Sequence, residues 1–273
     1  MKISTNIAVL MTCHNRQKIT LTCLKALYEQ QLSEDIFLSV YLTDDGCNDG
    51  TPEAIKKSFP NVHIIHGNGK LYWNRGMLAA WEEAAKKHHD FYLWLNDDTF
   101  LTSHALASIV EDWQNAPQHN CIIVGATTSP DGKKTTYSGR VTRGDIIPPN
   151  GTLQPCQEFN GNCVLVPNVV FEKLGMLDRY FRHSFGDIEY GMRANRAGIP
   201  CYVARNHVGV CEEHSLKPKW LRRDVPIIER FRHFYSPLGM SPLELFYLNR
   251  KYNGIMLGGV VFLLNHWRCL IAK

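Results

Sequence analysis

The stretch that decides the fold is Phe91-Tyr92-Leu93-Trp94-Leu95-Asn96-Asp97-Asp98, in which an apolar run ends abruptly at two carboxylates. Five consecutive apolar and aromatic residues predict a buried strand. A strand with acids at its carboxyl end places them in the crevice where open α/β sheets bind ligands. Asp97 and Asp98 would repel each other there unless a cation lies nearby, and a hard divalent metal that also holds phosphate oxygens suits that role. A solvated, Asp-rich turn is the alternative interpretation.

A second strand ends in the same way earlier in the chain. Val40-Tyr41-Leu42-Thr43 is apolar and leads directly into Asp44-Asp45-Gly46-Cys47-Asn48-Asp49-Gly50-Thr51. A tight turn followed by a helix cap would account for this segment taken alone. Two strand ends rich in acids and glycines within one sheet nevertheless predict a site for a nucleoside diphosphate.

Strand-like and helix-like segments alternate along the chain. Strands are expected at 7–11, 37–43, 62–65 and 91–95, with helices at 18–31, from Thr51 onward and at 75–87. This order predicts a Rossmann-like α/β fold, with a mostly parallel sheet and helices on both faces. Further strands are expected at 121–125 and 163–166, a hairpin or loop at 127–152, and a helix at 187–197.

The composition fits one enzyme domain with an appendage. Hydrophobic residues make up 44% of the 273, which is ample for a core. The nine cysteines lack paired CxxC spacing, which argues for a reducing compartment and against a disulfide scaffold or a structural zinc site. The sequence shows neither a signal-peptide core nor an apolar segment long enough to span a bilayer. We therefore expect a cytoplasmic protein, and the mild net charge of +4 gives no reason to expect a nucleic-acid partner.

Six motifs, taken in order, resemble those of the GT-A glycosyltransferases of the inverting family 2. The resemblance covers roughly residues 5–212, and within the family it is strongest to bacterial hexosyl- and rhamnosyltransferases that build surface polysaccharides such as O-antigen or capsule. The motifs are Thr12-Cys13-His14-Asn15-Arg16, Asp44 to Thr51, Asn74-Arg75-Gly76, Asn96-Asp97-Asp98, Asn160-Gly161-Asn162-Cys163 and Gly186-Asp187-Ile188-Glu189.

The resemblance implies a set of residues that bind the donor. The loop after the first strand would wrap the base and ribose, and Asp44 would accept a hydrogen bond from a uracil-like imide. A helix start with a cation favours a diphosphate, although a plain surface helix is the alternative there. Asp97 would face the donor sugar. The implied donor-binding residues are Thr12, Asn15, Arg16, Asp44, Asn74, Arg75 and Asp97.

Asp98 matches the last acid of the family's DxD motif, which holds the metal, and Asn96 stands at its first position. The resemblance therefore implies Mg²⁺ or Mn²⁺ bound by Asp98 and largely by the donor's phosphates. Many relatives complete the metal shell with a histidine, where the alignment here falls nearest Cys211. A thiolate is a poor ligand for a hard cation, so His207 and His214 are the alternatives.

Asp187 matches the catalytic base of the family. Inverting transfer needs a carboxylate that removes the proton of the acceptor hydroxyl as its oxygen attacks the anomeric carbon. The family's Glu-Asp-x-Asp becomes Gly186-Asp187-Ile188-Glu189, which keeps the aspartate expected to be the base. A simple helix cap is the alternative role for Asp187.

The acceptor or sugar pocket is expected to include Trp73, Asn162, Glu189 and His207. The function implied is metal-dependent, inverting transfer from a UDP- or dTDP-sugar to a glycan or polyprenyl-linked glycan. A nucleotide-sugar-binding protein that has lost activity is one alternative, because residues 96, 186 and 211 depart from the family pattern. A sugar-nucleotide pyrophosphorylase is another, but Thr12–Arg16 lacks the glycine-rich loop with arginine and lysine that such enzymes need.

Residues 216–273 differ in composition from the catalytic domain expected at 1–215. Ser241-Pro242-Leu243-Glu244 has the form of a helix capping box, and the apolar run Ile255–Leu264 is about half the length of a spanning helix. A basic and apolar extension predicts peripheral binding to an anionic surface on the inner face of the cytoplasmic membrane. The alternative is that residues 241–272 fold back over the catalytic domain. The basic residues are Lys217, Lys219, Arg222, Arg223, Arg230 and Arg232.

Overall fold

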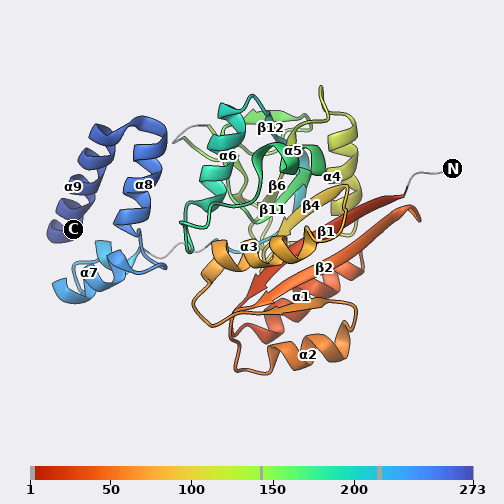
Figure 1. The fold of residues 1–273 in the computed structure, drawn as a ribbon, viewed down its shortest axis with the longest axis horizontal. Coiled ribbons are helices and arrows are strands. Elements are labelled where there is room, and N and C mark those ends of the chain that lie inside the picture. Colours follow the sequence, from red (N-terminus) through yellow and green to blue (C-terminus); the bar gives the residue numbers. More distant parts are fainter. Residues whose placement is uncertain (1–3, 142–143, 214–216, 273) are drawn as a thin grey trace.

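The computed structural model describes residues 4–141, 144–213 and 217–272, and it contains an α/β domain followed by a group of helices (Figure 1). The main sheet has the strand order β3-β2-β1-β4-β11-β6-β12-β5, with β7 and β9 pairing β6 and β12. Its strands are β1 (Thr5–Cys13), β2 (Ile36–Asp44), β3 (His63–His66), β4 (Phe91–Leu95), β5 (Phe100–Leu101), β6 (Ile122–Thr128), β7 (Thr135–Tyr137), β9 (Gln154–Cys156), β11 (Cys163–Pro167) and β12 (Cys201–Val210). The strands β8 (Gly139–Arg140) and β10 (Glu158–Phe159) form a separate pair.

The sheet is mostly parallel, as the sequence predicts. Strands β1, β2, β3 and β4 are parallel neighbours. Strand β11 runs antiparallel to both β4 and β6, so β6 and its parallel partner β12 point the same way as β4. The carboxyl ends of β1, β2 and β4 therefore meet at one edge of the sheet, which is where the acidic segments begin.

Helices cover both faces of the sheet because the strands alternate their side chains. In β1, Val9 packs with the cluster under α1 (Gln17–Tyr28), α2 (Thr51–Ser58) and α4 (Ala105–Gln114). Its neighbour Leu10 points to the other face, under α3 (Tyr72–Ala84), α5 (Asn168–Leu174) and α6 (Gly186–Arg196). All five residues of β4 are buried, which explains their uniformly apolar character.

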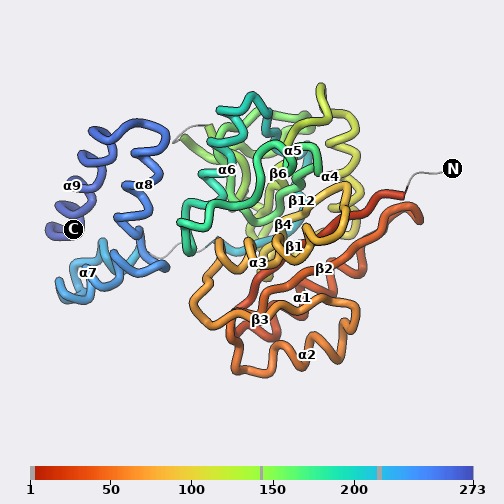
Figure 2. Tube along the Cα trace, viewed as in Figure 1, coloured from red at the N-terminus to blue at the C-terminus, as the bar shows by residue number. Residues whose placement is uncertain are grey.

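The C-terminal residues form η1 (Lys219–Leu221), α7 (Ile227–Tyr235), α8 (Pro242–Asn253) and α9 (Ile255–Ile271). Figure 2 shows these helices at one end of the molecule, with α9 far from the N-terminus. Helix α8 contacts the α/β domain, since Glu244 pairs with Arg182 and Lys251 pairs with Asp178. No helix among the described residues has the length and apolar character needed to cross a membrane.

The capping box predicted at 241–244 is wrong. Ser241 does precede α8, but its side chain makes no capping hydrogen bond. Its hydroxyl instead accepts a hydrogen bond from Arg182 Nη2 at 3.2 Å, and Glu244 Oε1 accepts one from Arg182 Nε at 2.6 Å. Glu244 is buried, and a buried carboxylate gains more from a guanidinium than from a backbone amide.

Candidate active site

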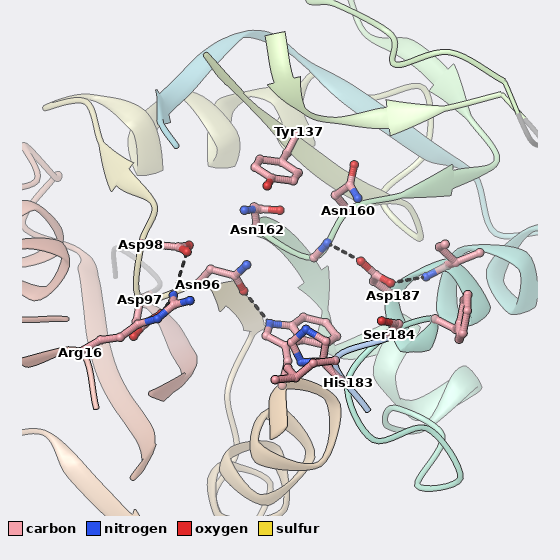
Figure 3. Close-up of a pocket in the computed structure, with 15 residues that line it drawn as sticks. Arg16, Asn96, Asp97, Asp98, Tyr137, Asn160, Asn162, His183, Ser184 and Asp187 are labelled. Atoms are coloured by element: carbon pink, nitrogen blue, oxygen red, sulfur yellow. Dashed lines mark hydrogen bonds and ion pairs between the residues drawn. The ribbon is translucent and has the colours of Figure 1, made fainter. Parts of the chain in front are cut away.

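The acidic end of β4 opens onto a cavity of about 660 Å³ (Figure 3). Its walls come from segments far apart in the sequence: the turn after β4, the start of α3, the turn before β11, the first turn of α6 and the connection between α7 and α8. The lining residues are Arg16, Trp73, Asn96, Asp97, Asp98, Tyr137, Asn160, Gly161, Asn162, His183, Ser184, Phe185, Asp187, Ile188 and Leu238.

The turn after β4 is held by hydrogen bonds that orient its polar side chains. The backbone N–H of Asn96 donates to Asn162 O at 3.0 Å, which continues the pairing of β4 with β11. Trp73 Nε1 donates to Asn96 Oδ1 at 2.6 Å. The amide at the first position of the acidic motif is thus tied to the aromatic wall of the cavity.

Arg16 is shared between the two carboxylates that follow β4. Its Nη1 lies 2.9 Å from Asp98 Oδ2 and 3.3 Å from Asp97 Oδ1. Asp97 is 6% exposed and also accepts a hydrogen bond from Thr20 Oγ1 at 3.1 Å. Burial raises the pKa of Asp97 to about 6, and Arg16 opposes that rise while Asp98 adds to it. Asp97 therefore faces the protein interior, and Asp98 is the more accessible acid.

The residues around Asp98 suit a hard cation that takes most of its ligands from a bound diphosphate. The Asp98 side chain is 20% exposed at the cavity, and its carboxylate, which is paired with Arg16, has the hard oxygen atoms that such a cation prefers. Cys211 Sγ lies 3.7 Å from Asp98 Oδ1, which agrees with the alignment at that position. Burial raises the pKa of Cys211 to about 12, so the group beside Asp98 is a neutral thiol.

The structure describes only one of the two histidines considered as further metal ligands. His207 is exposed, lies outside the cavity and is 2.9 Å from Thr135 Oγ1 through its Nε2. That position separates it both from Asp98 and from the acceptor pocket expected to contain it. His214 lies outside the described residues.

Asp187 lies in the first turn of α6, on a different side of the cavity from Asp98 (Figure 3). Its Oδ2 accepts a hydrogen bond from Gly161 N at 3.0 Å, and its Oδ1 accepts one from Ile188 N at 2.8 Å. Burial raises the pKa of Asp187, and these two N–H donors oppose that rise. The carboxylate is therefore fixed in orientation and is more basic than an ordinary aspartate.

Three of the expected donor-binding residues, Thr12, Asn15 and Asp44, do not line the cavity and lie at or just after the ends of β1 and β2. Thr12 is buried near the end of β1. Asn15 has a φ of 52° and accepts a hydrogen bond from the N–H of Asn48 at 2.8 Å. Asp44 Oδ1 accepts a hydrogen bond from the N–H of Cys47 at 2.8 Å. These contacts join the two loops into one surface next to Arg16.

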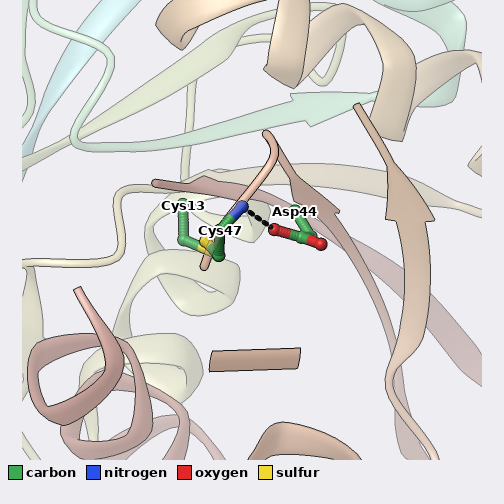
Figure 4. A group of neighbouring side chains, drawn as sticks. All are labelled: Cys13, Asp44 and Cys47. Carbon is green, nitrogen blue, oxygen red and sulfur yellow. Dashed lines mark hydrogen bonds between the residues drawn. The ribbon is translucent and has the colours of Figure 1, made fainter. Parts of the chain in front are cut away.

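A thiol pair lies at the same place. Cys13 and Cys47 have their sulfurs 3.9 Å apart, and Asp44 completes a group whose ligand atoms all lie within 4.8 Å of one another (Figure 4). Sulfur ligands favour soft metals, whereas Mg²⁺ and Mn²⁺ prefer oxygen. This group is therefore distinct from the Asp98 region where the hard cation is expected.

Asn74 and Arg75 are turned toward a neighbouring loop and do not line the cavity. The backbone N–H of Asn74 donates to Arg182 O at 3.0 Å, and its side-chain amide donates to Asp178 O and Phe181 O. Arg75 Nε donates to Arg179 O at 3.1 Å. These donors hold the 178–182 loop against α3, which differs from the diphosphate contact expected for them.

Glu189 is also used for packing. It is fully buried and accepts hydrogen bonds from Arg193 Nη2 at 3.0 Å, Lys251 Nζ at 2.9 Å and Tyr252 OH at 2.7 Å. The last two residues belong to α8. Glu189 thus joins α6 to the C-terminal helices, outside the cavity where the sequence suggested it.

Five cavity residues lie outside the motifs and candidate residues of the sequence analysis: Tyr137, His183, Ser184, Phe185 and Leu238. Tyr137 lies on β7, within the stretch expected only as a hairpin or loop. Leu238 lies between α7 and α8 and is 63% exposed. An exposed leucine close to Pro237 and Gly239 is a weak hint at most, because single apolar residues on a surface are common.

Comparisons with known proteins identify the family of this chain. The family model "Glycosyl transferase family 2" matches residues 8–175. N-acetylglucosaminyl-diphospho-decaprenol L-rhamnosyltransferase of Mycobacterium tuberculosis is 24% identical over 212 residues, which are 65% of this chain and 68% of that protein.

Solved structures share the fold at low sequence identity. The mannosyltransferase PcManGT of Pyrobaculum calidifontis, in complex with GDP-Man and Mn²⁺, gives a TM-score of 0.58 at 15% identity, over 99% of this chain and 74% of that one. Staphylococcus aureus TarS 1–349 with UDP-GlcNAc gives 0.60 at 10% identity, over 91% and 82%. The chain therefore belongs to glycosyl transferase family 2 and is a glycosyltransferase with the GT-A fold.

Proposed function

We propose that this glycosyltransferase moves a sugar from a nucleoside-diphosphate donor to a lipid-linked glycan, with inversion at the anomeric carbon. The observation that carries the proposal is the presence of Asp98 and Asp187 on different sides of one cavity. An in-line displacement needs the leaving diphosphate on one face of the sugar and a base for the acceptor hydroxyl on the other. Two carboxylates in this arrangement meet both needs.

The donor nucleotide lies, in this proposal, along the carboxyl ends of β1 and β2. Thr12, Asn15 and Asp44 contact the base and ribose, and Arg16 approaches the diphosphate from the same side. A carboxylate at Asp44 suits the imide N–H of uracil or thymine, which favours a UDP- or dTDP-sugar. The presence of UDP-GlcNAc in the TarS structure supports a uracil donor.

Asp98 and the donor's phosphates would hold Mg²⁺ or Mn²⁺, which would neutralise the charge of the departing diphosphate. The Mn²⁺ in the PcManGT complex supports this assignment. Asp97 stays with Arg16 and Thr20 and positions the turn after β4. Its orientation leaves the metal-binding role to Asp98.

Asp187 takes the proton of the acceptor hydroxyl as that oxygen attacks the anomeric carbon. The N–H groups of Gly161 and Ile188 hold the carboxylate in place, so no reorientation is needed when the acceptor arrives. The raised pKa of Asp187 makes the carboxylate a stronger base than a solvated aspartate.

The acceptor enters beside Trp73, Asn162 and Leu238, which line the cavity. The mycobacterial relative is named for an acceptor linked to decaprenol, which supports a polyprenyl-linked glycan here. Synthesis of a surface polysaccharide such as O-antigen or capsule, on the cytoplasmic side of the membrane, follows as the setting. In this scheme residues 1–215 form the catalytic domain, and 216–273 form an extension that serves the acceptor side.

The test is transfer from a panel of UDP-, dTDP- and GDP-sugars to a polyprenyl-diphosphate-linked sugar, with Mn²⁺ and with a chelator. We expect transfer by one donor, dependence on metal and an inverted linkage by NMR of the new anomeric proton. Donor binding without transfer or hydrolysis would instead indicate a binding protein that has lost activity. Formation of a nucleoside triphosphate from the donor and pyrophosphate would indicate a pyrophosphorylase.

A further inference from the structure

Helix α9 is apolar on two opposite sides, and only one of them is packed. Gly258, Asn265 and Cys269 are buried on the inner side. A methyl group on Gly258 would lie 3.3 Å from the ring of Phe246, which shows how closely α9 approaches α8. His266 contacts the aromatic rings of α7 through Phe234. This inner side is sufficient to hold α9 on the C-terminal group of helices.

The outer side of α9 carries a continuous apolar stripe. At 100° per residue its members fall within about a third of the helix circumference, on the side opposite Gly258 and Cys269. Their exposed fractions range from 46% to 85%, and no charged residue interrupts them. Soluble proteins seldom expose so many neighbouring apolar side chains without a partner. The stripe consists of Met256, Val260, Leu263, Leu264, Trp267, Leu270 and Ile271.

The segment around the stripe is strongly basic. Residues 217–272 contain nine lysines and arginines against three acids. Of the acids, Glu244 is buried against Arg182 and Asp224 pairs with Arg222, so neither offsets the remaining cations. Arg223 and Arg232 are both exposed. Apolar residues with a tryptophan, flanked by cations, have the chemistry of a helix that lies in a membrane interface.

We infer that the outer stripe of α9 docks on a bilayer that contains anionic lipid. The helix would lie in the plane of the interface, with Leu263 and Trp267 among the acyl chains and the cations of η1 and α7 near the headgroups. A second copy of the chain is a poorer partner, because a symmetric contact through α9 would bring two basic segments together.

The same group of helices forms part of the cavity wall. Leu238, in the connection from α7 to α8, lines the cavity that contains Asp187. Docking through α9 would thus bring the acceptor side of the cavity to the membrane surface, where a lipid-linked glycan is presented. This last step rests on the proposed function, whereas the docking itself does not.

The test is flotation of the full chain with vesicles of phosphatidylcholine, with and without phosphatidylglycerol. We expect binding that depends on phosphatidylglycerol and weakens with salt. Leu263→Glu combined with Trp267→Glu should lower binding at least about tenfold, since each methylene removed from the acyl region costs several-fold. Val169→Glu, at an exposed apolar site on α5, should bind as the wild type does.

Charge reversal tests the electrostatic part of the membrane interaction separately from the apolar part. Arg223→Glu combined with Arg232→Glu should reduce binding to phosphatidylglycerol vesicles by at least about 25-fold, at roughly fivefold for each charge lost. Circular dichroism would confirm that all variants are folded. Transfer to a water-soluble acceptor analogue should stay unchanged in the α9 variant, so a failure of docking and a failure of the enzymatic proposal can be told apart.

Three results would overturn the inference. The wild-type chain could remain unbound at low salt, or the α9 double variant could float as well as the wild type. Sedimentation could also reveal a dimer that the α9 double variant dissociates while no form binds vesicles, in which case a second copy covers the stripe.

Discussion

Arg16 and Asp98 form an ion pair at the edge of the cavity, with 2.9 Å between Arg16 Nη1 and Asp98 Oδ2. The two partners are the cation expected to meet the donor's diphosphate and the carboxylate expected to meet the metal. When a metal and a diphosphate bind, this ion pair would therefore be replaced by two others: Arg16 with the negatively charged diphosphate, and Asp98 with the metal cation. The exchange makes donor and metal binding interdependent.

Arg16→Gln should affect the two ligands in opposite directions. Without nucleotide, Mn²⁺ should bind a few-fold more tightly, because a partly exposed ion pair that competes for Asp98 contributes about 0.2–1 kcal/mol. The donor should bind roughly tenfold or more weakly, since a charge-assisted hydrogen bond contributes about 1.5–3 kcal/mol. Calorimetric titrations with Mn²⁺ alone and with UDP measure both changes. Lys18→Gln, an exposed cation on the same helix, is the control, and parallel loss of both affinities would contradict the exchange.

Asp98→Ala should nearly abolish transfer by removing the carboxylate that we propose as a ligand of the metal. Neutralising the leaving diphosphate contributes several kcal/mol to the transition state, so we expect a loss of roughly 10³-fold or more. Turnover measured with Mn²⁺ and with a chelator is the appropriate assay. Asp131→Ala, in an exposed turn, should retain wild-type activity. Near-normal turnover of Asp98→Ala in the presence of a chelator would show that Asp98 does not act through a metal.

Asp187→Asn should lower kcat by roughly 10²–10⁴-fold, the usual contribution of a general base, with donor and metal affinities nearly unchanged. The wild-type kcat should fall as the pH drops through the raised pKa of Asp187, because only the carboxylate accepts the proton. That acid limb should be missing from the residual activity of Asp187→Asn. Loss of donor affinity in the variant would instead indicate a structural or donor-binding role.

Asp97→Asn should change how stability depends on pH. The folded state raises the pKa of Asp97 to about 6, so its contribution to stability is present below its unfolded pKa of about 3.9 and is lost as the pH rises through 6. Relative to wild type, Asp97→Asn should gain up to about 3 kcal/mol between roughly pH 4 and pH 8. Urea unfolding at both ends of this range tests the sign, with Glu53→Gln on α2 as the control. If the difference in unfolding free energy between Asp97→Asn and wild type were the same at both pH values, the prediction would be contradicted.

Glu189→Gln should loosen the C-terminal helices from the catalytic domain. It leaves Lys251 and Arg193 without their buried carboxylate, and breaking such a pair typically costs about 3–5 kcal/mol. We expect a lower unfolding free energy and faster proteolysis between α6 and α8. Glu34→Gln, at an exposed loop position, should leave both unchanged. Normal stability together with a selective rise in the acceptor KM would restore the acceptor role expected from the sequence.

The sequence was sufficient for the parallel strands β1 to β4, and it supplied candidate residues for one side of the site. The alternating apolar segments predicted the strands of the parallel half. Asp44 and Asp98 became candidates because they stand at, or just after, the carboxyl ends of two of these strands. This worked because the carboxyl ends of parallel strands share one edge of a sheet, whatever the details of packing. The resemblance to the family added Asp187 as a candidate. Its place in the first turn of α6 agrees with the helix expected at 187–197.

The other side of the cavity was decided only by tertiary structure. His183 and Leu238 come from irregular segments and Tyr137 ends the three-residue strand β7, and no periodicity indicates where such segments meet. Asn74 and Glu189 carry groups suited to a ligand, but the N–H donors of Asn74 and the carboxylate of Glu189 pair with other groups of the protein, because burying a donor or a charge without a partner is costly. The sequence by itself thus determined which residues end the strands of the sheet, whereas packing decided which polar side chains bind the protein and which remain available to a substrate.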